Sequence, residues 1–405
     1  MSTFIYEASD KDGNIEKGKL AAGNRREVVE YLGRKNLIPI AIEKEGETTT
    51  IKGLSFVLFE TVKPIDRILL VRNLSATIKA GLNIIESLDI LIADFTKNVM
   101  RNILTQAKFN LQRGQPLSST FAYYKKYFPP IFVGMVKAGE ASGRLDSTLE
   151  ELGGYLIKEY NLVRKVRSAL AYPAILLVAS AGVITLLLTF VLPRLAKSFE
   201  MSKVELPFIT KALIEASDVL MYSPVLDLLA VAALFCFFIY FRRTPTGRKI
   251  FLKFFMKIPM ARDLVKKVAL VRFARTLSSL LSSGIGVIEA LNISAEAVSN
   301  ETYKAVILGS VSQVKSGVPL SKIFGNYPKL FPHLLINMMA VGERTGTLEH
   351  ILKTFSNFYD EEVDNALKDL TTVLEPILLL FMGLVVGLIA LSILLPIYEL
   401  VGKFA

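Results

Sequence analysis

The chain has 405 residues, of which 52% are hydrophobic, and it carries a formal net charge of +11. The apolar residues are concentrated in a few long runs, which indicates an integral membrane protein with room for two or three domains. No basic cluster is interleaved with aromatic residues that we expect to be exposed, so we expect no direct binding of nucleic acid. Basic loops facing anionic lipid account for the charge. The single cysteine, Cys236, excludes an internal disulfide bond.

Residues 1–45 are predicted to form a small N-terminal α+β module. Three short runs with strand character surround a helix that begins after Asn24, which is a good N-cap residue. The start of the chain lacks the basic and apolar regions of a signal peptide, so we expect this module to stay in the cytoplasm. Residues 46–63 begin with Gly, Glu and a run of Thr and are predicted to be a linker.

Residues 64–167 are predicted to form a first cytoplasmic helical bundle. Apolar residues recur there at intervals of three and four, and glycines and prolines separate about six helices. The last helix leads into residues 168–192, which carry no charge and are long enough to cross the ~30 Å hydrocarbon core. This first transmembrane helix has Tyr172 and Pro173 at its start, where the missing N–H of proline is tolerated best.

The remainder of the chain repeats this plan after one additional span. The predicted segments are a polar outer (periplasmic) connection at 193–218, transmembrane helix 2 at 219–241, a second cytoplasmic bundle at 242–372, transmembrane helix 3 at 373–398 and a short outer tail at 399–405. Basic residues flank the bundle side of the spans, which places the N-terminus in the cytoplasm and the C-terminus in the periplasm. The predicted fold class is therefore an all-α polytopic membrane protein with two homologous cytoplasmic bundles, three transmembrane helices and the small α+β module.

An internal repeat supports this division. Residue i aligns with residue i+203 without a gap from Arg72/Arg275 to Pro173/Pro376, and 26 of these 102 positions are identical. The identical pairs include glycines and prolines, at which the backbone conformation is most restricted. We therefore interpret the chain as a duplicated unit made of one bundle and one span.

Two turns of the form GE-[AR]-[ST]-G-x-L are the most distinctive motif of the repeat. Their residues are Gly139, Glu140, Gly143 and Leu145 in the first copy, and Gly342, Glu343, Gly346 and Leu348 in the second. One interpretation is a tight interhelical turn, in which glycine permits positive φ, Ser142 or Thr345 caps the next helix, and the glutamate lies near the N-terminus of that helix. The other interpretation is a surface that contacts a partner protein.

Glu375 and Pro376 begin the third span at the positions that Tyr172 and Pro173 occupy in the first. A carboxylate in a span is a candidate functional residue, because its removal from water is costly. Its position close to the membrane interface is equally compatible with a solvated residue of no particular function.

The order of these features resembles the type II secretion system F family, which includes the inner-membrane platform proteins of type IV pili. The resemblance covers nearly the whole chain and rests on the N-terminal module, the two glycine turns, Tyr172-Pro173, Glu375-Pro376 and the sequence LPFIT at 206–210. It implies a platform protein of a type II secretion or type IV pilus machine. Such a protein couples a hexameric cytoplasmic assembly ATPase to the insertion or extraction of pilin or pseudopilin transmembrane helices.

The sequence contains no recognisable catalytic triad, nucleotide-binding loop or cluster of metal ligands. We therefore expect no enzymatic activity, no cofactor and no metal ion. The resemblance also implies contacts with other inner-membrane assembly proteins, with membrane lipids and with further copies of the chain. The alternative function is a membrane transporter or channel subunit with cytoplasmic regulatory domains, and secretion, pilus and DNA-uptake machines all remain open.

Overall fold

A computed structural model of the protein describes residues 2–9, 15–35, 37–44, 61–194, 211–215, 244, 247 and 259–404. Outside the described residues lie the predicted second transmembrane helix at 219–241, most of the connection before it with the LPFIT sequence, Cys236, and most of the predicted linker. Contacts divide the chain into two compact units, Met1–Tyr127 and Phe128–Ala405. The first unit therefore ends before the last helices of the first repeat.

The first unit begins with an antiparallel sheet in the strand order β2-β1-β3. Its elements are β1 (Ser2–Ser9), β2 (Ile15–Ala22), α1 (Arg25–Arg34) and β3 (Ile38–Lys44). Asn24 caps α1, since its side chain accepts a hydrogen bond of 3.0 Å from the Glu27 N–H. Apolar side chains from β1, β2 and α1 form one small core, which contains Phe4, Ala8, Ala22, Val28, Leu32 and Leu37.

Four helices complete the first unit, and each packs against the next along the chain. They are α2 (Pro64–Lys79), α3 (Ile84–Asp94), α4 (Asn98–Gln112) and α5 (Leu117–Tyr123). Pro64 occupies the first turn of α2, where a missing N–H costs nothing. Asn83 and Glu86 form a reciprocal capping box at the start of α3, so this helix begins where local chemistry favours a start.

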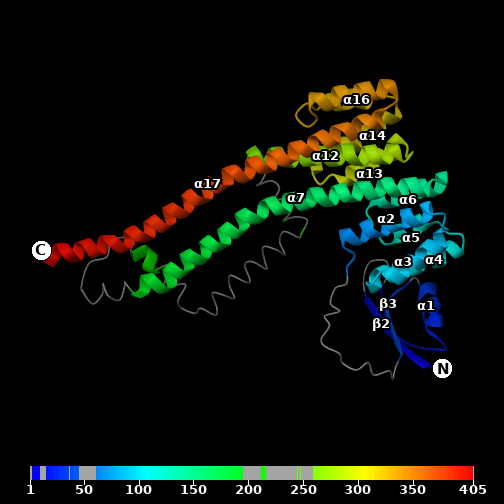
Figure 1. Ribbon diagram of the computed structural model, residues 1–405, viewed down its shortest axis with the longest axis horizontal. Helices are drawn as coiled ribbons and strands as arrows, with labels where there is room; N and C mark the ends of the chain where they lie inside the picture. Colours follow the sequence, from blue (N-terminus) through cyan, green and yellow to red (C-terminus); the bar gives the residue numbers. More distant parts are fainter. Residues whose placement is uncertain are drawn as a thin grey trace. The chain divides into compact units, whose positions relative to one another are not determined.

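The second unit is built around three long helices (Figure 1). Helix α12 packs along α17, and α7 contacts both of them. The elements are α6 (Pro130–Ser142), α7 (Leu145–Leu186), the π-helical turn η1 (Leu187–Val191), α12 (Pro259–Ser282), α13 (Val287–Ala297), α14 (Glu301–Lys315), α15 (Leu320–Gly325), α16 (His333–Thr345) and α17 (Leu348–Phe404). Stacked aromatic rings of Phe324 and Phe331 lie in the core beneath α12, with centroids 4.4 Å apart.

The internal repeat is visible in the backbone. Helices α3, α4 and α6 have the same length as α13, α14 and α16, and each begins 203 residues before its counterpart. In the described residues, the glycines with positive φ form three pairs at this spacing: Gly81/Gly284, Gly114/Gly317 and Gly143/Gly346. The repeated glycines therefore mark repeated left-handed turns, which is the reason the sequence keeps them.

Two helices in the described part of the chain are long and apolar enough to cross a membrane, and they span Leu145–Arg194 and Leu348–Leu395. The most apolar 18-residue window of each is only 11% buried, which distinguishes these helices from the core helix of a soluble protein. Large apolar side chains such as Val178 and Leu380, each 73% exposed, face outward. The start of each apolar segment lies inside a continuous helix, so one helix extends from the bundle into the candidate span.

Candidate functional site

Each GE turn ends one helix with a glycine in the left-handed conformation. Gly143 follows α6 with φ 66°, and Gly346 follows α16 with φ 71°. The Arg144 N–H donates to the Gly139 carbonyl at 3.0 Å, and the Thr347 N–H donates to the Gly342 carbonyl at 2.9 Å. The two copies therefore share the long hydrogen bond of a Schellman C-cap. The N–H of the left-handed glycine differs, since Gly143 donates to the Glu140 carbonyl and Gly346 donates to the Gly342 carbonyl.

The first glycine of each motif lets the following helix begin in close contact. A Cβ atom added to Gly139 would lie 3.1 Å from the Leu145 Cα, and one added to Gly342 would lie 3.0 Å from the Leu348 Cα. Leu145 and Leu348 are the first residues of α7 and α17. The sequence-predicted residues of each motif thus meet at one sharp corner.

Glu343 does not lie at the N-terminus of the helix that follows it, contrary to the expectation from sequence. Its carboxylate accepts hydrogen bonds from the backbone N–H groups of Leu320, at 2.5 Å, and Ser321, at 3.1 Å, and from the Ser321 hydroxyl at 2.5 Å. It therefore caps α15, whose N-cap residue Pro319 makes no side-chain cap hydrogen bond. Glu140 occupies the matching, half-buried position on α6.

The expectation that Ser142 or Thr345 caps the next helix is also wrong. The Ser142 hydroxyl donates to the Ala138 carbonyl at 2.8 Å, and the Thr345 hydroxyl donates to the Val341 carbonyl at 3.0 Å. Both side chains therefore bind carbonyls of their own helix, which is the local alternative open to hydroxyls in the last turn.

The starts of the first and third predicted spans meet. The Tyr172 hydroxyl donates a hydrogen bond of 3.0 Å to the Glu375 carboxylate, and these residues occupy equivalent positions of the two repeats. Pro173 is buried inside α7, far from the first turn of that helix, and Pro376 is exposed on α17. The missing N–H of Pro173 is therefore accommodated within a continuous helix and not at a helix start.

Polar side chains also join α7 to α12 and α17 on the bundle side of this contact, and we call this set the charged seam. Its ion pairs and hydrogen bonds connect the first repeat to the second over much of the bundle. The contacts across the seam are Glu151–Lys353 at 3.4 Å, Glu151–Ser279 at 3.0 Å, Tyr155–Thr276 at 3.3 Å, Lys158–Asn357 at 2.7 Å, Glu159–Arg272 at 2.6 Å and Lys165–Asp364 at 2.6 Å.

A further ion pair beside the seam joins α12 to α17, and its Arg275 is a deeply buried charge. Its side chain is 4% exposed and is paired with Asp360 of α17. In the described residues its Nε and Nη1 atoms have no hydrogen-bond partner, and the same holds for Nε of Arg272. A buried cation with unsatisfied donors is costly, so loss of Asp360 would leave an uncompensated charge between α12 and α17.

Two side chains of the seam have shifted pKa values. Burial, together with the nearby Glu159 carboxylate, raises the pKa of Tyr155 to about 12. Burial also lowers the pKa of Lys158, and the Arg275 guanidinium acts in the same direction. Burial is therefore the main influence on the ionisation of both side chains, and the neighbouring charges add to it.

The contacts of the seam and the Arg275–Asp360 pair do not follow from the sequence pattern, although one signal is present. Arg275 interrupts the apolar run of α12 and is identical with Arg72 in the repeat alignment. Its partner Asp360 is 85 residues away, and that separation carries no pattern that a single sequence reveals.

Comparisons with known proteins extend over the whole chain. The family model for type II secretion system (T2SS) protein F matches residues 70–193 and 273–396, and the model for its N-terminal domain matches residues 1–43. The chain is 32% identical over 405 residues to the type IV pilus assembly protein PilC of Thermus thermophilus, with 100% of both chains covered. It is 30% identical over 409 residues to the type II secretion system protein F of Pseudomonas aeruginosa, with 99% of both chains covered. The matches to two copies of one family model agree with the repeat, and the chain belongs to the type II secretion system protein F family.

Proposed function

We propose that the chain is the inner-membrane platform protein of a type IV pilus or type II secretion machine. The observation that carries this proposal is the continuity of α7 and α17, each of which begins at a glycine turn and continues into an exposed apolar segment. Neither helix is interrupted between its turn and its apolar segment, even at Pro173 and Pro376, so a displacement at the turn is transmitted along it. The names of the relatives, which are pilus assembly and secretion proteins, support the same function.

Membrane placement is part of the proposal. Three spans, 168–192, 219–241 and 373–398, place both bundles and the N-terminus in the cytoplasm and the C-terminus in the periplasm. The two exposed apolar helices support the first and third spans. Fusions of alkaline phosphatase to the C-terminus test this topology, since the enzyme is active only when it is exported.

The partners in this proposal are a hexameric cytoplasmic assembly ATPase, pilin or pseudopilin transmembrane helices, other inner-membrane assembly proteins, and further copies of the chain. ATP hydrolysis belongs to the ATPase, and the platform transmits the resulting movement. The GE turns are the proposed contact with the ATPase. Leu145 precedes the start of the first span by 23 residues of continuous helix, so this turn lies roughly 35 Å from the membrane, within reach of a cytoplasmic protein.

The experiment is co-purification of the full-length protein in detergent with the ATPase encoded beside it. Arg144→Glu and Arg344→Glu change exposed side chains at the two turns without removing a glycine. The matched control is Arg101→Glu, an exposed arginine on α4 outside both turns. Thermal unfolding shows that each variant remains folded.

We expect the ATPase to be lost from one turn variant and retained by the control, which also identifies the repeat that docks it. If wild-type protein retains no ATPase in any nucleotide state, the platform proposal is contradicted. Solute flux through the purified protein in liposomes then tests the transporter alternative. Equal retention by all variants would instead assign the turns to scaffolding alone.

A further inference from the structure

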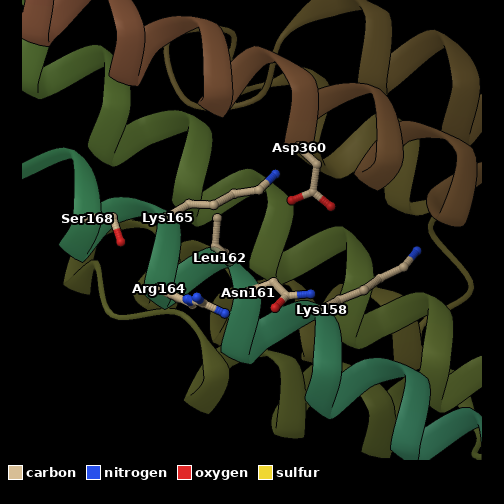
Figure 2. A pocket seen from close by; sticks show the side chains of 7 residues that line it. All are labelled: Lys158, Asn161, Leu162, Arg164, Lys165, Ser168 and Asp360. Carbon is tan, nitrogen blue, oxygen red and sulfur yellow. The ribbon is translucent and has the colours of Figure 1, made fainter.

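A pocket of about 420 Å³, lined mainly by residues with polar side chains, lies between α7 and α17, beside the predicted start of the first span (Figure 2). It is lined by Lys158, Asn161, Leu162, Arg164, Lys165 and Ser168 of α7, and by Asp360 of α17. The mechanism proposed above does not use it. Its lining contains three cationic side chains and one carboxylate, so the pocket attracts anions.

The spacing of the polar residues produces one donor face. Asn161, Arg164, Lys165 and Ser168 follow the i, i+3, i+4, i+7 pattern, which places them on one side of α7. The amide, guanidinium, ammonium and hydroxyl groups all donate hydrogen bonds, and a phosphate group offers several acceptor oxygens. The guanidinium of Arg164 matches a phosphate group in its planar, two-pronged geometry.

Two of the three cations in the lining have no carboxylate partner in the described residues. One of them, Lys158, donates a hydrogen bond of 2.7 Å to the Asn357 amide oxygen. Lys165 extends toward α17, where its Nζ lies 2.6 Å from the Asp364 carboxylate, and Asp360 is paired with Arg275. Arg164 is exposed and has no ion-pair partner in the described part of the chain. The one carboxylate of the lining is thus neutralised from within the bundle, and the attraction for an anion remains.

The position of the pocket relative to the predicted membrane surface indicates the source of the anion. Ser168 is the first residue of the predicted span, and Arg164 precedes it by four residues, or roughly 6 Å along the helix. The polar headgroup layer occupies roughly this zone at the edge of the ~30 Å hydrocarbon core. We propose that the pocket binds the phosphate group of an anionic phospholipid from the cytoplasmic leaflet. This inference rests on the membrane placement in the proposed function.

The test uses the full-length protein purified in detergent and exposed to equal amounts of phosphatidylglycerol and phosphatidylcholine. Native mass spectrometry counts the lipids that each protein molecule retains. Arg164→Gln removes the unpaired cation that lies closer to the predicted span, and Ser168→Ala removes a hydroxyl without changing the charge. Arg167→Gln is the matched control, because Arg167 is an exposed arginine on the same helix and does not line the pocket.

We expect Arg164→Gln to lower the affinity for phosphatidylglycerol about fivefold, Ser168→Ala to lower it less, and Arg167→Gln to leave it unchanged. An equal loss in Arg164→Gln and Arg167→Gln would overturn the proposal, because it indicates general surface attraction. Unchanged retention in Arg164→Gln would overturn it as well.

A second arm adds millimolar inorganic phosphate to separate the two sources of this group. If inorganic phosphate alone displaces phosphatidylglycerol, and if this displacement also depends on Arg164, the pocket binds free phosphate. That result would overturn the lipid assignment. Membrane fractionation of wild-type cells tests membrane insertion independently of lipid binding, so a failure of the lipid proposal can be distinguished from a failure of the platform proposal. If the protein inserts normally and only the lipid result fails, the platform proposal is unaffected.

Discussion

At the scale of single residues, the two glycines of each GE turn meet different physical demands. Gly346 needs positive φ and has open space around it, whereas Gly342 has an ordinary helical backbone but no room for a Cβ atom. Sequence alone shows both as repeated glycines. The two demands become separable only when the neighbouring helix is in place.

We predict that Gly342→Ala and Gly346→Ala both destabilise the protein. The first forces Leu348 away and costs about 1–3 kcal/mol, and the second strains a left-handed residue by about 1–2 kcal/mol. Gly309→Ala is the control, since Gly309 lies inside helix α14 with nothing within 4 Å of an added Cβ, and it should stabilise by about 1 kcal/mol. Thermal unfolding midpoints in detergent give the order of stability of the three variants. A midpoint of Gly342→Ala at or above that of the wild-type protein would show that a Cβ atom fits at this position.

We also predict that Glu343 is a structural residue of the second bundle. Glu343→Ala removes the acceptor for three hydrogen bonds at the start of α15 and should destabilise by about 1–3 kcal/mol. Glu343→Gln, which keeps one acceptor oxygen, should cost less. Glu296→Gln, at an exposed position of α13, serves as the control for loss of a carboxylate. Equal midpoints for Glu343→Ala and the wild-type protein would show that α15 needs no cap.

At the scale of helices, the charged seam and the ion pair beside it explain how α7, α12 and α17 keep their register. Apolar packing alone, as among Leu162, Val271 and Val363, tolerates small sliding of one helix along another. The pair formed by Arg275 and Asp360 resists sliding, because sliding would leave the buried Arg275 without its partner. This pair therefore suits a bundle that transmits force along its helices.

The pair formed by Arg275 and Asp360 should show strong energetic coupling. We predict that Arg275→Met costs about 3 kcal/mol or more, whereas the double variant with Asp360→Leu costs much less than the sum of the two single changes. Lys165 and Asp364 form the control pair, since both side chains are more than a third exposed and their coupling should be below about 1 kcal/mol. A double-mutant cycle on unfolding free energies measures both values. Additive effects at Arg275 and Asp360 would contradict the role of this pair.

At the scale of the whole molecule, the two repeats are joined at equivalent heights of α7 and α17. The hydrogen bond between Tyr172 and Glu375 connects residues at the same position of each repeat, beside the proposed membrane surface. A platform that works by moving one repeat relative to the other needs this contact to open or slide.

We predict that a covalent bridge at this contact stops assembly. Tyr172→Cys and Glu375→Cys, combined with Cys236→Ser, place two thiols where a short bismaleimide can join them. Bridged protein should remain in the membrane while pilus assembly or secretion falls to the level of a strain without the protein. Each single-cysteine variant treated with the same reagent is the control. Normal assembly by the bridged protein would show that the spans work as one rigid pair.

The sequence by itself determined the local structure and the duplication. Pro64, Asn83 and the repeated glycines act on their own backbone, so helix starts and left-handed turns follow from residue type. The apolar segments that begin at Ser168 and Val373 were equally clear, because length and the absence of charge suffice to recognise them. The family follows from the same repeated motifs.

Only the tertiary structure decided which distant groups meet. Glu343 binds the start of α15, and its partner Ser321 lies 22 residues earlier in the chain. The first N–H groups of a helix have no partner within the helix, so they bind a carboxylate that the fold places beside them. Arg275 and Asp360, and Tyr172 and Glu375, are likewise paired by packing between helices. Such contacts depend on how three helices align in space, and the spacing of residues along one chain does not encode that alignment.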